Sequence, residues 1–115
     1  MKKGEMNEII FAIFFGVATL FPAMFLYKNI LLATSLVLIV SGLGILFWRT
    51  KSNLYIFVFA GIFGPISEML CVHHGAWNYS IANFVNIPVW LFFIWGNAGQ
   101  FLYNTGLLIK RLIKE

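Results

Sequence analysis

The stretch ILLATSLVLIVSGLGILFW, Ile30 to Trp48, has no charged residue and is long enough to cross the hydrocarbon core of a bilayer as a helix. Three other apolar runs have about the same length. The four runs are Ile9–Tyr27, Ile30–Trp48, Leu54–His73 and Ile87–Ile109. Each run is expected to be helical, because every backbone N–H and C=O group inside lipid needs a hydrogen-bond partner. The sequence therefore predicts an all-α protein: a single-domain integral membrane bundle of four transmembrane helices over residues 1–115.

Composition supports this fold class. Of the 115 residues, 61% are hydrophobic and 10% are charged, whereas about 25% of residues are charged in an average soluble domain. A water-soluble fold is excluded on these grounds. The basic residues flank the apolar runs and accompany no nucleic-acid-binding motif, so we expect no nucleic-acid partner. Cys71 is the single cysteine, which rules out a disulfide within the chain.

The basic residues also predict how the bundle is oriented. With four spans, both termini and the loop from Arg49 to Asn53 lie on one side of the membrane. That side collects Lys2, Lys3, Arg49, Lys51, Lys110, Arg111 and Lys114, and the other side has only Lys28. Cytoplasmic loops are enriched in Lys and Arg, so both termini are predicted to be cytoplasmic in a multi-pass protein of the cell membrane. The loop 74–86 then faces outward, and its aromatic residues are typical of a membrane interface.

The third apolar run contains Glu68, the only acidic residue far from either terminus. Placing a charged side chain at depth in a membrane costs on the order of 3 kcal/mol, so Glu68 is expected to face the bundle interior and to have a partner. Gly64 and Pro65 precede it and are expected to kink or locally open the helix. Two interpretations stay open: a functional carboxylate, or a neutral acid bonded to a carbonyl that Pro65 leaves free.

Polar and aromatic residues around Glu68 complete the candidate site. The predicted proton- or substrate-binding residues are Glu68, His73, His74, Trp77, Tyr79, Trp90, Asn97 and Gln100. Asn97, Gln100 and Asn104 follow i, i+3, i+7 spacing and share one helix face. They either form interhelical hydrogen bonds or line an internal cavity that continues the surroundings of Glu68, and Thr19 and Ser41 are candidates to line it too.

Metal, cofactor and enzyme signatures are weak or missing. Glu68, Cys71 and His74 would fan across about 120° of a helix and lack a fourth ligand, so no metal is expected. No cofactor is expected either. The chain has no nucleophile elbow, no His-Glu-x-x-His motif and no phosphate-binding glycine loop. Whether the protein is an enzyme stays open.

A family resemblance covers Glu68 to Phe93. Glu68, Gly75-Ala76-Trp77-Asn78-Tyr79 and Ile87-Pro88-Val89-Trp90-Leu91-Phe92-Phe93 together resemble the membrane-embedded lycopene cyclases and related carotenoid-biosynthesis membrane proteins. The same pattern resembles an uncharacterised family of small membrane proteins. The resemblance implies a similar helix arrangement and a pocket for an isoprenoid or another lipid. It does not imply cyclisation, because the cyclases have a pair of glutamates after the proline, where this chain has Val89 and Trp90.

Three functional hypotheses follow. The first is a membrane protein with an outward-facing aromatic pocket around Glu68, which binds or modifies an isoprenoid or lipid-like molecule. The second is a proton-coupled transporter of small molecules that works as a homodimer and uses Glu68 to exchange protons. The third is an accessory subunit of a membrane complex, with Glu68 paired to a basic residue of the partner.

Overall fold

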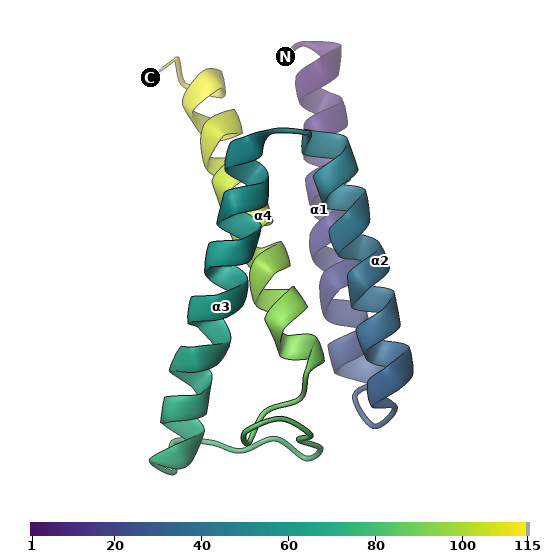
Figure 1. The fold of residues 1–115 in the computed structure, drawn as a ribbon. Coiled ribbons are helices and arrows are strands. Elements are labelled where there is room, and N and C mark those ends of the chain that lie inside the picture. Colours follow the sequence, from purple (N-terminus) through teal and green to yellow (C-terminus); the bar gives the residue numbers. More distant parts are fainter. Residues whose placement is uncertain (115) are drawn as a thin grey trace.

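The computed structural model describes residues 1–114, which form four α-helices. These are α1 (Lys3–Phe25), α2 (Ile30–Trp48), α3 (Lys51–His73) and α4 (Trp90–Leu112) (Figure 1). The predicted all-α class is confirmed. Three of the helices, α1, α2 and α3, are long and apolar enough to cross a membrane. The fourth, α4, is as long as α1 and α3, but its amide side chains make it less hydropathic.

The helix boundaries agree with the apolar runs except where local contacts extend or shorten a helix. The helix α1 starts at Lys3, earlier than predicted, and the Glu5 carboxylate accepts a hydrogen bond from the Lys2 backbone N–H at 3.0 Å. Similarly, α3 starts at Lys51 because the Thr50 hydroxyl oxygen caps it, accepting from the Asn53 N–H at 3.0 Å. The bounds of α2 are as predicted.

The later start of α4 has a different cause. Phe84 and Ile87 exchange backbone hydrogen bonds of 2.9 Å in a tight turn, so Ile87 cannot be helical. Pro88 follows, and its carbonyl accepts from the Leu91 N–H at 3.1 Å as the helix begins. The third helix runs without a break through Pro65, so the expected local opening before Glu68 does not occur.

Each helix runs antiparallel to the helix before it in the chain, and both chain ends lie at the same end of the bundle (Figure 1). The helix α4 packs against each of the other three. Its most extensive packing is with α3, whereas α2 and α3 contact each other only slightly. The figure shows α3 joined to α2 near the chain ends and diverging from it toward the other end. Thus α4 holds α3 to the rest of the bundle.

Glycines allow α3 and α4 to approach closely. A Cβ atom added at Gly96 would lie 2.6 Å from the Phe57 ring, and one at Gly99 would lie 2.7 Å from the Ala60 Cβ. Both distances are shorter than carbon atoms tolerate. Small residues at such contacts let the backbones of membrane helices pack against each other.

The distribution of polar residues is the reverse of that in a soluble protein. Large apolar side chains are exposed along the helices, among them Val58, Phe59, Ile62 and Phe63 on α3. The buried polar residues are Thr19, Ser41, Asn53, Asn97, Gln100 and Asn104. An apolar surface of this extent marks a protein that is covered by a partner or by lipid.

Candidate functional site

Glu68 lies on α3 and is half-buried. Its carboxylate accepts two hydrogen bonds, one from the Tyr79 hydroxyl and one from the Trp95 indole N–H. Tyr79 belongs to the loop between α3 and α4, and Trp95 lies on α4. The carboxylate thus joins two helices and the loop at one point. Hydrogen bonds to an ionised carboxylate are roughly twice as strong as those between neutral groups.

Gly64 makes room for the indole that reaches Glu68. Gly64 and Glu68 are one helical turn apart, so they lie on the same face of α3. A Cβ atom at Gly64 would overlap three ring atoms of Trp95: Cγ, Cδ2 and Cε3. The ring therefore lies directly on the backbone of α3 at Gly64. In the sequence Gly-Pro-x-x-Glu, the glycine leaves room for the Trp95 ring and the glutamate accepts the hydrogen bond from the Trp95 N–H.

Tyr79 connects Glu68 to a cavity. Burial, followed by the hydrogen bond to Glu68, raises the pKa of the Tyr79 hydroxyl above its ordinary value of 10.0. The other side of the Tyr79 ring faces Trp90 in an edge-to-face arrangement, with the ring centroids 6.3 Å apart. Tyr79 is therefore held at one end by Glu68 and at its ring by Trp90.

The cavity beside Tyr79 has a volume of about 380 Å³. It lies between α1, the loop and the start of α4, and is called the outer cavity below. Its lining residues are Leu20, Ala23, Tyr27, Asn78, Tyr79, Ser80, Ile81, Trp90, Leu91 and Ile94. Three of these are aromatic, and Asn78 and Ser80 add polar groups from the loop. Aromatic walls with a few polar groups are typical of small-molecule sites.

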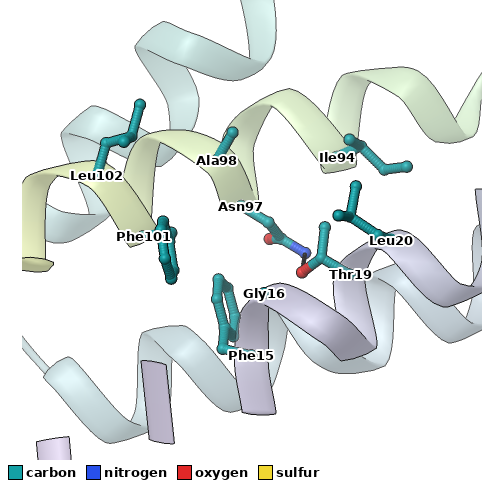
Figure 2. Close-up of a pocket in the computed structure, with 9 residues that line it drawn as sticks. All are labelled: Phe15, Gly16, Thr19, Leu20, Ile94, Asn97, Ala98, Phe101 and Leu102. Atoms are coloured by element: carbon teal, nitrogen blue, oxygen red, sulfur yellow. Dashed lines mark hydrogen bonds between the residues drawn. The ribbon is translucent and has the colours of Figure 1, made fainter. Parts of the chain in front are cut away.

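A second cavity of about 320 Å³ lies farther along the same two helices (Figure 2). This inner cavity is lined by Phe15, Gly16, Thr19, Leu20, Ile94, Asn97, Ala98, Phe101 and Leu102. Figure 2 shows Asn97 hydrogen-bonded to Thr19 across it, with Leu20 and Ile94 toward one end and Phe15 and Phe101 toward the other. Apart from the amide and hydroxyl, its walls are apolar.

The amides of α4 form a buried hydrogen-bond network with the other helices. Asn97 donates to the Thr19 hydroxyl on α1 at 3.2 Å and accepts from the Ser41 hydroxyl on α2 at 2.6 Å. The Gln100 amide donates to the Asn97 oxygen at 3.4 Å and accepts from the Asn53 amide on α3 at 2.7 Å. Asn53 also accepts from the Asn104 amide at 2.6 Å. The predicted stripe therefore joins all four helices through interhelical hydrogen bonds.

The structure separates the predicted site residues into three places. Glu68, Tyr79 and Trp90 lie together at the outer cavity, although Glu68 is behind Tyr79 and does not line the cavity. Asn97 and Gln100 belong to the buried network. On α4, Asn97 is turned about 200° from Trp95, so the network and Glu68 lie on opposite sides of that helix.

The remaining predicted residues are exposed at and beyond the end of α3: His73 is its last residue, and His74 and Trp77 follow it. The rings of His73 and His74 meet edge to face, 5.2 Å apart, and none of the three residues lines the outer cavity. Within residues 1–114, no three His, Cys, Asp or Glu side chains are grouped to hold a metal ion.

Two residues that hydrogen-bond to predicted site residues are not themselves among the sequence predictions. Trp95 is one of many aromatic residues on α4, and nothing near it in the sequence marks it as a partner of Glu68. Asn53 is placed in a connecting loop by its polarity, yet it is the third residue of α3 and almost fully buried. Thr50 is a favoured residue type for a helix N-cap, and this signal could have placed Asn53 in the helix.

Comparison with protein-family models, curated proteins and solved structures gives no match. The contacts and cavities of the described residues are therefore the basis for assigning a function.

Proposed function

We propose that the protein spans the cell membrane four times with both termini in the cytoplasm. The apolar surface and the buried amides support this assignment, because lipid would cover the former and the latter bond to one another. The amides of α4 face the other helices, which accounts for its lower hydropathy and allows it to span beside α1, α2 and α3. The chain ends lie on one side of the bundle, as an even number of spans requires (Figure 1).

We propose further that the outer cavity binds an isoprenoid or a similar lipid-like molecule. The observation that carries this proposal is the aromatic cavity of about 380 Å³ whose wall residue Tyr79 is anchored by Glu68. Its volume lies within the range of roughly 300–1,000 Å³ found for small-molecule sites. The resemblance to carotenoid-biosynthesis proteins favours an isoprenoid among apolar ligands.

In this proposal Glu68 positions the wall of the site. Its carboxylate accepts from Tyr79 and Trp95 and so fixes the loop against α3 and α4. The function proposed is binding, because the carboxylates that the cyclases have after their proline are replaced by Val89 and Trp90.

Photocrosslinking in proteoliposomes tests the binding proposal. A diazirine derivative of geranylgeraniol should label Tyr79 and Trp90, and unmodified geranylgeraniol in excess should suppress this labelling. The Leu36 to Leu43 face of α2 serves as the internal control, since contact there with bulk lipid should not be saturable. Glu68→Ala should reduce labelling at the loop, whereas Glu8→Ala, at the other end of the bundle, should not. Equal and unsaturable labelling of both faces would disprove the proposal.

A second candidate, proton-coupled transport, is favoured by one observation. The Glu68 carboxylate accepts a hydrogen bond from the Tyr79 hydroxyl, so a group that can bind a proton lies in contact with a group that can donate one. Proteoliposomes with an imposed pH gradient should then lose it when an apolar cation such as tetraphenylphosphonium is added, and Glu68→Gln should abolish the effect. A gradient that persists with the unmodified protein rejects transport of that cation.

A further inference from the structure

The outer and inner cavities adjoin along α1 and α4. Leu20 and Ile94 line both of them, so these two side chains lie where the cavities meet. Figure 2 shows both side chains at one end of the inner cavity. On α4 the combined lining extends from Trp90 to Leu102, a length of about 18 Å at 1.5 Å per residue. The two cavities thus lie end to end along α1 and α4, and together they are called the α1–α4 groove below.

The two ends of this groove differ in chemistry. At the outer end Asn78, Tyr79 and Ser80 supply polar groups, and none of the residues described as lining the groove is charged. At the inner end the polar atoms of Asn97 and Thr19 are bonded to each other or to the buried network. A ligand there meets apolar side chains and polar groups that already have partners.

The groove between α1 and α2 provides a comparison. It is larger, about 690 Å³, and its lining from Phe14 to Leu43 is wholly apolar. It has no polar end, as expected of a surface that contacts lipid chains without selection. The α1–α4 groove differs by joining a polar mouth to an apolar channel.

We propose that the α1–α4 groove binds a single-chain amphiphile with an uncharged, oxygen-containing head, and that Gly16 and Ala98 set the length of chain it admits. This inference rests on the proposed function and extends it. The head lies at the loop, near Asn78 and Ser80. The chain passes Leu20 and Ile94 and ends between Phe15 and Phe101. Gly16 on α1 and Ala98 on α4 are the smallest residues lining the inner cavity.

The length limit follows from the space at Gly16. A Cβ atom there would meet the Phe101 ring at 3.5 Å, an ordinary van der Waals contact, and because Gly16 lines the inner cavity a larger side chain would occupy part of it. Gly16→Leu should therefore fill the inner cavity and leave the outer cavity open. Gly42 on α2 is the matched control, because a Cβ atom there meets nothing within 4 Å and Gly42 lines neither cavity.

Chain-length selectivity in nanodiscs tests the inference. The probes are diazirine derivatives of octanol, hexadecanol and hexadecyl phosphate, and the readout is the probe concentration for half-maximal labelling at Tyr79 and Trp90. Gly16→Leu should weaken hexadecanol labelling by about tenfold or more, because at least two chain methylenes lose their site. It should change octanol labelling less than about twofold, and Gly42→Leu should alter neither. The unmodified protein should prefer hexadecanol to its phosphate.

The outcomes separate the inference from the proposed function. If octanol and hexadecanol weaken equally in Gly16→Leu, or neither weakens, the inference is wrong even though the outer cavity binds ligand. A preference for hexadecyl phosphate overturns the assignment of an uncharged head. If no probe gives saturable labelling at Tyr79 or Trp90, the proposed function itself fails. Ala98→Leu adds a larger side chain to the inner cavity from α4 and should also weaken hexadecanol labelling without weakening octanol labelling. If Gly16→Leu does not fold, Ala98→Leu provides the test of the chain-length limit.

Discussion

Gly64→Ala is the substitution whose effect the structure predicts most sharply. The added methyl overlaps the Trp95 ring, so the indole must move away from α3. Overpacking of this kind costs about 1–3 kcal/mol. Moving the ring also breaks its hydrogen bond to Glu68, and a hydrogen bond to a charged group contributes about 1.5–3 kcal/mol. Alanine gains roughly 1 kcal/mol over glycine in a helix. The expected net loss in free energy of unfolding is about 1.5–5 kcal/mol.

Equilibrium unfolding in mixed detergent micelles, monitored by circular dichroism, measures this loss. Gly42→Ala is the control and should be neutral or slightly stabilising, since its methyl group meets no atom within 4 Å. A double-mutant cycle with Trp95→Ala isolates the overlap, because Gly64→Ala should cost little once the indole is removed. If Gly64→Ala costs as much in the Trp95→Ala background, or no more than Gly42→Ala, the packing explanation is refuted.

Three other substitutions test separate parts of the bundle. Asn97→Ala removes the centre of the amide network and should lower the free energy of unfolding by about 1–3 kcal/mol, which the same micelle titration measures. The pKa of Tyr79 is raised in the folded state, so its contribution to stability is fully present below pH 10.0 and is lost as the pH rises further. Thermal unfolding between neutral and strongly alkaline pH should show a smaller loss for Tyr79→Phe than for the unmodified protein, and identical curves would contradict this. Glu8→Gln breaks the 2.6 Å ion pair with Arg111, which is half exposed, and should cost less than about 1 kcal/mol at low salt and still less at high salt.

The helices and the polar stripe were predictable from local sequence, because apolar run length and i, i+3, i+7 spacing depend only on nearby residues. The partner of each stripe residue was not. Ser41 and Thr19 were candidates, but Asn53 was assigned to a loop on polarity alone. The side chain of a residue so near a helix start can turn inward, and the structure buries it against Gln100.

Glu68 shows the same limit at the site. Its need for a partner follows from the cost of an acidic side chain in an apolar helix, and the sequence predicts that need. The identity of the partners depends on how α3 and α4 pack against each other, with the Trp95 ring in the space that Gly64 leaves. One partner, Tyr79, was in the predicted set. The other, Trp95, could not be distinguished from the neighbouring aromatic residues.

The central place of α4 has a consequence for biosynthesis. It is made after α1, α2 and α3, yet it supplies the contacts that hold α3 to α1 and α2. Until Trp90 and the residues after it are made, the Asn53 side chain lacks Gln100 and Asn104, the partners of its amide group. The four helices can therefore join into one bundle only after α4 has been made, and a chain truncated before α4 would leave α3 without most of its packing contacts.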